Sequence, residues 1–418
     1  MLRRACLALA TAGLVLTTAG TAAAVPAPDG DLASGAAAST SPGVSADTGT
    51  MATGQELTGR VSLYPRAIRL QHSGETNGRI IASVVTFTER GGEGQILEST
   101  DDGRSFRSIG AIPASQQAGT QGLCCASIFE LPRRVGDLPA GTLLWSGSVG
   151  ADAGPDRRMT QRIWRSDDHG RTWSYLSTCS EAPNARGQWE PELSVDAEGR
   201  LVCHFADETE GPEGSQRLVR RVSTDGVTWG PKQVTVASRE GAFRPGMPVV
   251  RRLPNGSYVM TYEICGVPGQ YDCAIYWRTS PDGNDWGDPA DTGRMIRAVS
   301  GRYFSHTPTI TVIPRPGGPS RIVLVGQLLQ NPDGSIAEGN GATIMVNEQD
   351  GNGPWREESA PVAVPGAYNN YCPNYSSTLV ATLDRRSLIE IATDYAANGE
   401  CIAYFDTAPI SGSRADGQ

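Results

Sequence analysis

Short segments rich in β-branched residues recur along the chain, whereas helical periodicity of useful length is absent. Six such segments cover residues 79–85, 142–146, 201–205, 258–262, 322–326 and 388–392. A turn containing glycine or aspartate precedes each segment, and another apolar segment precedes that turn, which is the pattern of a β-hairpin. The sequence therefore predicts an all-β chain with six hairpins.

A second pattern, serine–aspartate–glycine–aromatic, repeats between these hairpins. Clear copies occupy residues 99–106, 166–173, 223–229 and 280–286, and a worn copy runs from 347 to 355. Their first residues are 57 or 67 positions apart. A regular period of this length is typical of a propeller or another repeat array.

The chemistry of this repeat is that of a hairpin turn. Serine and aspartate side chains hydrogen-bond the local backbone, glycine supplies a positive φ, and the aromatic ring packs back on the sheet. The repeat resembles the Asp-box of sialidase-like β-propellers, where its role is structural. At about 60 residues per blade, residues 59–418 correspond to a six-bladed β-propeller with Asp-box hairpins. The last blade, around 401–407, is expected to close on a strand from residues 59–63.

The N-terminal residues predict export. Arg3 and Arg4 precede an apolar stretch and small residues that end at Ala24, so residues 1–24 are interpreted as a signal peptide. The paired arginines leave a twin-arginine route open. Residues 25–58 contain little to bury and are interpreted as a disordered leader, followed by the catalytic propeller at 59–418. No other apolar run is long enough to span a membrane, so we expect a secreted, extracellular protein.

The net charge excludes some classes of binding partner. The net charge is −9 and no basic patch stands out, which argues against nucleic acid and anionic membranes as partners.

Eight cysteines follow the signal peptide, and export favours disulfides, of which Cys265–Cys273 and Cys372–Cys401 are the expected local pairs. The remaining pairings stay open. The four histidines show no metal-ligand spacing, so we expect no metal and no cofactor, and a monomer that binds an oligosaccharide or polysaccharide.

Blade geometry predicts which side chains converge. In a propeller, the start of each innermost strand and the end of the next strand lie on the same rim, which we call the blade rule. The starts of the inner strands supply Tyr64, Arg66, Glu190, Arg244, Arg302, Tyr303, His306, Asn374 and Tyr375, and the ends of the second strands supply, among others, Ser148, Asp207, Glu208 and Glu263. We expect these polar and aromatic groups to form one site at the axis.

Glu190 and Glu263 belong to neighbouring blades and are predicted to face the axis together. A carboxylate pair is what glycoside hydrolysis requires, because one group protonates the leaving oxygen while the other attacks or activates water. Trp189 would exclude water beside Glu190 and raise its pKa. Each arginine in the set either binds the substrate or forms a structural ion pair across blades.

Four stretches carry a specific resemblance: YPRAI at 64–68, WEPEL at 189–193, residues 244–263, and NYSSTLV at 374–380. Together they resemble the exo-arabinanases of glycoside hydrolase family 93, over residues 60–410. That resemblance implies a six-bladed propeller that releases arabinobiose from α-1,5-L-arabinan with retention. It also implies Glu190 and Glu263 as the catalytic pair. The order of their roles stays open; the position of Glu263 on the inner hairpin, where it should lie beneath the sugar, favours Glu263 as nucleophile and Glu190 as acid/base.

An exo-α-sialidase remains an alternative. It would use Tyr375 as nucleophile and Glu263 as its base, with a cluster of three arginines around the substrate carboxylate: Arg66, Arg244 and Arg302. Against it, sialidases have Arg-Ile-Pro in the first blade, where this chain has Tyr64-Pro65-Arg66.

A non-catalytic carbohydrate-binding propeller is the second alternative. Such a protein would need no paired carboxylates, so the predicted convergence of Glu190 and Glu263 argues against it. A Ser-His-Asp hydrolase is disfavoured further, because no G-x-S-x-G turn between strand and helix is present in the sequence.

Overall fold

The computed structural model describes residues 51–89, 91–114, 122–212, 215–238 and 243–411. All of these residues belong to one compact unit. The predicted signal peptide and most of the predicted leader, up to residue 50, lie outside the described residues. Among the described residues no helix is long and apolar enough to cross a membrane.

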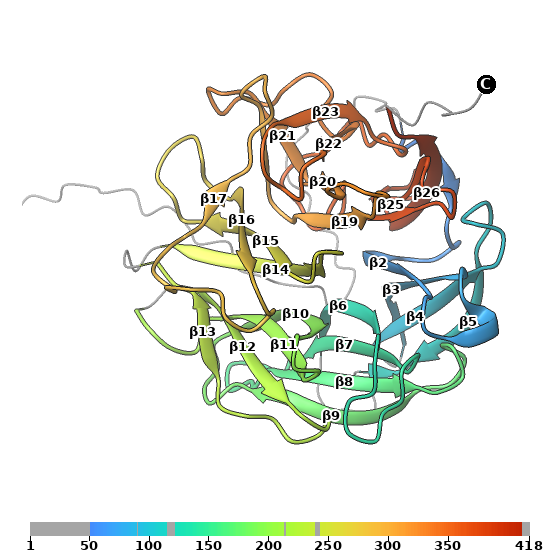
Figure 1. Cartoon of the computed structure of the whole chain (residues 1–418), viewed down its shortest axis with the longest axis vertical. Helices are drawn as coiled ribbons and strands as arrows, with labels where there is room; N and C mark the ends of the chain where they lie inside the picture. Colours follow the sequence, from blue (N-terminus) through green and yellow to red (C-terminus); the bar gives the residue numbers. More distant parts are fainter. Residues whose placement is uncertain (1–50, 90, 115–121, 213–214, 239–242, 412–418) are drawn as a thin grey trace, which may run out of the picture. The chain divides into compact units, whose positions relative to one another are not determined.

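Within the described residues the strands form six antiparallel sheets, which surround a central axis as blades (Figure 1). Blade 1 contains β2 (Leu63–Arg69), β3 (Ile80–Thr88), β4 (Gly91–Ser99) and β5 (Arg107–Ile112). Blade 2 contains β6 (Leu123–Glu130), β7 (Leu143–Val149), β8 (Thr160–Ser166) and β9 (Ser174–Glu181). Blade 3 contains β10 (Gln188–Val195), β11 (Leu201–Asp207), β12 (Arg217–Ser223) and β13 (Gln233–Val236).

Blades 4 to 6 follow the same meander. Blade 4 contains β14 (Arg244–Arg252), β15 (Tyr258–Cys265), β16 (Ala274–Ser280) and β17 (Arg294–Met295). Blade 5 contains β19 (Thr309–Ile313), β20 (Arg321–Val325), β22 (Thr343–Asn347) and β23 (Trp355–Ser359). Blade 6 contains β24 (Thr378–Ala381), β25 (Ser387–Tyr395), β26 (Cys401–Pro409) and β1 (Gln55–Glu56). Outside this pattern are the 3-10 turn η1 (Gly74–Thr76) and the short strands β18 (Tyr303–Ser305) and β21 (Leu328–Gln330).

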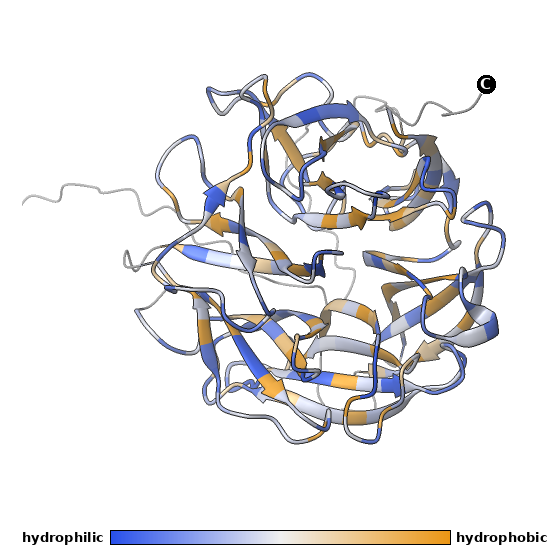
Figure 2. Cartoon of the chain, in the orientation of Figure 1, coloured by the Kyte–Doolittle hydropathy of each residue, from blue (hydrophilic) through white to orange (hydrophobic). Residues whose placement is uncertain are grey.

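The first strand of each blade lies at the axis, and successive inner strands contact one another in the order β2, β6, β10, β14, β19, β24 and back to β2. The apolar residues of the strands, orange in Figure 2, are buried between neighbouring blades. Trp145 of β7, for example, is fully buried and lies where a Cβ on Gly94 of β4 would be only 2.6 Å from its ring. The prediction of an all-β, six-bladed propeller is confirmed.

The predicted Asp-box turns connect the third and fourth strands of blades 1 to 5. In the second copy, Ser166 Oγ donates to Asp168 Oδ1 at 2.8 Å and accepts the N–H of Gly170 at 2.8 Å. The N–H of Thr172 donates to the same Asp168 oxygen at 2.9 Å. In the worn copy, the Asn347 side chain replaces serine and accepts the N–H of Gly351 at 2.8 Å. The polar residues of the repeat therefore close the turn.

This geometry predicts a stability defect without a loss of activity. Asp168→Ala removes the acceptor of the turn's N–H groups and is expected to lower the free energy of unfolding by about 1–2 kcal/mol. Asp167→Ala is the matched control, because Asp167 is exposed and makes a 3.6 Å ion pair with Arg165 at the surface. In thermal unfolding, Asp168→Ala should melt at a lower temperature than Asp167→Ala. Equal melting temperatures would contradict the role of Asp168 in stabilising the turn.

The ring closes through the N-terminal segment, but earlier in the chain than expected. The closing strand is β1, in which Gln55 and Glu56 pair with Phe405 and Tyr404 of β26. The strand predicted at 59–63 is therefore wrong in position, and residues 51–58 belong to the propeller rather than to a disordered leader. Among residues 51–60 only Leu57 is buried, so hydrophobicity gives little sign of the strand.

Four disulfides are present among the described residues. Both expected pairs, Cys265–Cys273 and Cys372–Cys401, are confirmed. The pairings left open are Cys179–Cys203, which joins β9 of blade 2 to β11 of blade 3, and Cys124–Cys125, which joins two adjacent residues of β6. Of these four bonds, the last alone lies wholly within an inner strand.

Candidate active site

Near the start of each inner strand lies a residue in the left-handed backbone region. These residues are Tyr64, Cys125, Glu190, Met247, Thr307 and Ser376, with φ between 50° and 61°. In β2, β6, β10 and β14 the pairing register shifts at this residue, and regular pairing resumes two positions later. A non-glycine residue in this region costs about 1–3 kcal/mol, and such strain clusters at functional sites. The rim at the axis is therefore the candidate site.

The strained backbone binds the predicted carboxylate pair. The N–H of Met247 donates to Glu190 Oε2 at 2.8 Å, and the N–H of Thr307 donates to Glu263 Oε2 at 2.8 Å. Each glutamate is thus held by the backbone at the start of the next inner strand. Glu263 also pairs in register with Gly246, the residue before Met247. The Gly246–Met247 backbone therefore contacts the Glu190 carboxylate and pairs with the backbone of Glu263.

Burial and mutual repulsion favour the neutral form of Glu190. Burial raises the pKa of Glu190 to about 8, the charge of Glu263 adds to the rise, and the N–H of Met247 opposes it. Burial also raises the pKa of Glu263, whereas His306 and the N–H of Thr307 lower it. At neutral pH the site can therefore hold a protonated Glu190. The N–H of Thr307 and His306 favour the charged form of Glu263 against the effect of burial.

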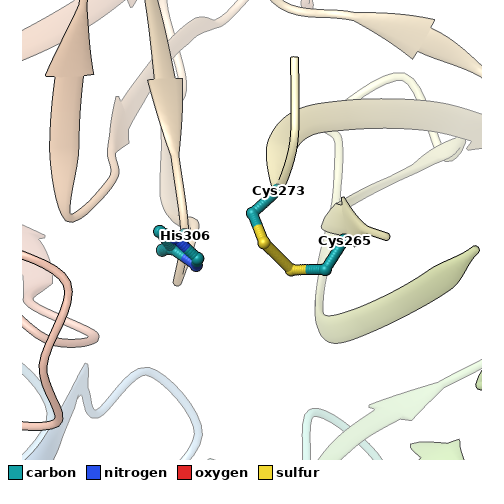
Figure 3. A group of neighbouring side chains, drawn as sticks. All are labelled: Cys265, Cys273 and His306. Carbon is teal, nitrogen blue, oxygen red and sulfur yellow. A yellow bond between two sulfur atoms is a disulfide. The ribbon is translucent and has the colours of Figure 1, made fainter. Parts of the chain in front are cut away.

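His306 and a disulfide border Glu263. His306 Nδ1 lies 3.9 Å from Glu263 Oε2, and the backbone N–H of His306 donates to the carbonyl of Cys273 at 3.0 Å. Figure 3 shows the imidazole facing the Cys265–Cys273 bond, and the His306 nitrogen and both sulfurs lie within 4.8 Å of one another. Metal ligation by cysteine requires a thiolate, and both sulfurs are joined in the disulfide.

Two tyrosines form one wall of the site. The rings of Tyr64 and Tyr375 are 6.2 Å apart, and both side chains pack in the same apolar cluster. Burial raises the pKa of Tyr375 well above its ordinary value, and the charges of Glu190 and Glu263 raise it further. Tyr375 is therefore close to both carboxylates.

Trp189 directly precedes Glu190 on β10 and is half-buried. The Arg157 guanidinium lies 5.4 Å from its ring. Its ring also packs against apolar clusters on both sides of blade 3. Trp189 therefore packs against the neighbouring blades, while a part of it stays accessible.

Arg244 completes the charged part of the site. It forms an ion pair with Glu208, and its guanidinium donates to Gln216 Oε1 at 3.0 Å. Burial has the largest effect on the pKa of Glu190 and of Glu263, but the positive charge of Arg244 lowers both.

Sequence reasoning missed Gln216. Its side chain donates to the carbonyl of Pro245 at 3.1 Å, in addition to accepting from Arg244. Gln216 directly precedes β12, the third strand of blade 3, and the blade rule was applied to the first two strands of each blade alone. Extending the rule to the starts of the third strands would have found it.

Arg66 was predicted to bind substrate but is engaged within the scaffold. It is buried, and its guanidinium stacks 4.2 Å above the Tyr64 ring. The same guanidinium donates to the carbonyls of Pro65 and Ser376. Arg66 therefore links blade 1 to the segment that leads into blade 6.

Asp207 and Asn374 are likewise held by protein partners. Asp207 is fully buried and forms an ion pair with Lys232 at 2.6 Å. Asn374 is buried and donates to the carbonyls of residues 326 and 327. Both side chains therefore use their polar groups on partners within the protein.

Arg302 and Tyr303 lie elsewhere than the prediction placed them. Their segment was assigned to the start of an inner strand, but Tyr303 begins β18, which pairs with β16 and β21 at the edge of the blade 4 sheet. Arg302 forms a 3.0 Å ion pair with Glu357 of β23, the outermost strand of blade 5. Tyr303 is buried, and its hydroxyl donates to the carbonyl of Gln270. The three arginines of the sialidase hypothesis do not share a set of contacts.

No protein-family model matches the sequence, and no curated protein matches it. Solved structures do resemble the fold. A GH93 α-L-arabinofuranosidase of Fusarium graminearum, in complex with arabinobiose, is 21% identical over 87% of this chain and 98% of its own, with a TM-score of 0.69. A Penicillium chrysogenum α-L-arabinanase complexed with arabinobiose is 23% identical over 85% of this chain and 98% of its own, also with a TM-score of 0.69. A Dyadobacter fermentans protein of unknown function reaches a TM-score of 0.57 at 12% identity, over 86% of this chain and 98% of its own. These likenesses establish the fold.

Proposed function

We propose that this protein is a secreted, retaining glycoside hydrolase that acts from the chain end on α-1,5-L-arabinan and releases arabinobiose. The observation that carries the proposal is the pair Glu190 and Glu263, each held at 2.8 Å by a backbone N–H at the start of the next inner strand. The arabinobiose complexes of the similar structures support the choice of sugar. Four disulfides and the N-terminal sequence support secretion.

The two carboxyl groups divide the chemistry. Protonated Glu190 donates its proton to the glycosidic oxygen as the bond to the anomeric carbon breaks. Ionised Glu263 attacks that carbon from the other side and forms a covalent glycosyl intermediate. Glu190, now ionised, takes a proton from water, whose oxygen attacks the same carbon and releases Glu263. The configuration of the sugar is retained because it is inverted twice.

The arrangement of arginines favours a neutral sugar over a sialoside. A sialic acid carboxylate needs several converging cations, but Arg302 is paired with Glu357 and Arg66 is buried against backbone carbonyls. Arg244 is already paired with Glu208. A neutral furanose requires none of these charges.

The decisive experiment offers the purified protein linear arabinan and a sialoside side by side and identifies the released sugar. We expect arabinobiose, whose anomeric configuration in early NMR spectra should match that of the substrate. Free sialic acid would instead support a sialidase with Tyr375 as nucleophile. Release of nothing, together with measurable glycan binding, would support a non-catalytic binding propeller.

The raised pKa of Glu190 predicts an alkaline limb in the pH profile. Burial raises this pKa to about 8, so the wild-type kcat/KM on arabinan should fall as the pH rises through that value and the acid loses its proton. Initial rates measured between neutral and alkaline pH check this. A profile that stays flat across that range would contradict Glu190 as the proton donor.

The same pKa links folding stability to pH. Between the ordinary value of 4.5 and about 8, the folded protein keeps a proton that the unfolded chain releases, so the free energy of unfolding falls as the pH rises. Glu190→Gln removes this contribution. The melting temperature of the variant relative to the wild type should therefore increase as the pH rises through this window. A difference in melting temperature that does not depend on pH would contradict the raised pKa of Glu190.

A further inference from the structure

The disulfide between Cys124 and Cys125 stands at the rim of the candidate site. Both residues lie near the start of β6, and Cys125 has a φ of 59°. It therefore occupies in blade 2 the place that Glu190 occupies in blade 3 and Met247 in blade 4. Blade 2 thus carries a disulfide at the position where blade 3 carries a carboxylate.

Backbone pairing places this disulfide beside Glu190. Cys124 pairs in register with Ser148 of β7. Ser148 Oγ accepts the N–H of Glu190 at 3.1 Å. A single serine thus links the strand that carries the disulfide to the strand that carries the predicted acid/base.

The disulfide also packs with the tyrosine wall. Cys125 is buried in a cluster with Tyr64 and Met247, and Cys124 and Tyr375 are partly buried against the same cluster. Cys124 therefore retains an exposed part next to the aromatic rings. The combined surface is apolar and borders the carboxylate pair.

Fold stability does not explain a bond at this place. A disulfide stabilises a fold mainly by shortening loops in the unfolded chain, and the effect grows with loop length. No residue lies between Cys124 and Cys125, so the bond closes no loop. What it does provide is a rigid, polarizable surface without a hydrogen-bond donor, which needs no further ordering when a ligand binds.

We propose that the Cys124–Cys125 disulfide is a substrate contact that packs against the C–H face of a sugar ring next to the carboxylate pair. This inference rests on the proposed function, because it takes the rim as the glycan site. It assigns the bond to binding and not to the chemical step. The expected consequence is a change in KM with little change in kcat.

The test compares KM and kcat on a linear α-1,5-arabino-oligosaccharide. Cys124→Ala/Cys125→Ala is expected to raise KM by roughly fivefold to thirtyfold, through lost apolar contact, and to leave kcat within about twofold. Cys124→Ala/Cys125→Gly should show the same changes in KM and kcat. In this second variant strain at position 125 cannot cause misfolding, because glycine adopts a positive φ without strain. Cys179→Ala/Cys203→Ala is the matched control, which should melt lower than the wild type with KM unchanged.

Three results would overturn the inference: an unchanged KM in both rim variants, an equal rise of KM in the control, or a loss confined to kcat. A wild-type protein that neither binds nor cleaves the oligosaccharide would instead contradict the proposed function. Calorimetric titration with arabinobiose gives an independent readout, because binding of this product requires no turnover. Its Kd should rise in the rim variants by a factor similar to that of KM.

Discussion

Replacing Glu263 with glutamine is expected to lower the turnover of linear arabinan by about 10⁴-fold or more, because the amide cannot form the covalent intermediate. Glutamine can still accept the N–H of Thr307, so the backbone that now holds Glu263 should remain in place. The loss should be as severe on an aryl α-arabinobioside as on arabinan, since bond cleavage in both needs the nucleophile. Steady-state rates on the two substrates measure this directly.

Glu192→Gln is the control for this variant. Glu192 lies on the same inner strand as Glu190, but its carboxylate forms an ion pair with Arg251. We expect a lower melting temperature and a rate within about tenfold of the wild type. If the rate of Glu263→Gln also stayed within tenfold of the wild-type rate, Glu263 could not be the nucleophile.

Replacing Glu190 with glutamine is expected to have the second-largest effect, a loss of about 10²–10⁴-fold on arabinan. The reason is that glutamine has no proton to donate to the leaving oxygen. An aryl arabinobioside with an acidic phenol needs less assistance, so bond cleavage in that substrate should be largely spared. Burst kinetics would show this as a rapid first turnover followed by slow release. If instead Glu263→Gln spared the aryl substrate, the two roles would be reversed.

The fold could be predicted from sequence because its signals are local and repeated. Alternating apolar residues indicate each hairpin, and the serine–aspartate turns appear in the structure between the third and fourth strands. The strand β1 was misplaced because Gln55 and Glu56 are exposed and contribute mainly backbone hydrogen bonds. Hydrophobic patterning cannot detect a strand of that kind.

The site could be predicted only in part, because the blade rule depends on where each inner strand begins. It succeeds where the strand starts at the rim, as for Glu190, whose carboxylate meets the next blade. It fails for Arg302 and Tyr303, because β18 extends the blade 4 sheet before the inner strand of blade 5 starts at Thr309.

The blade rule predicts neither the burial of a side chain nor the backbone N–H groups that bind it. It places Asp207 on the rim but cannot tell that Lys232 engages its carboxylate in the interior. The N–H groups that hold the two glutamates were missed because backbone groups carry no sequence signature. A weak signal does exist at Met247, which precedes a proline as Glu190 does.

The pairing of β1 with β26 has a consequence for biogenesis. Gln55 near the start of the propeller meets Phe405 near its end, so this contact is among the most non-local that the chain can make. Such contacts slow folding, because a long loop must close before they form. Until β26 has been synthesised, an incomplete ring also leaves a strand edge open to pairing with other chains. Successful production of this protein should therefore depend on the protection of the nascent chain until its last blade is complete.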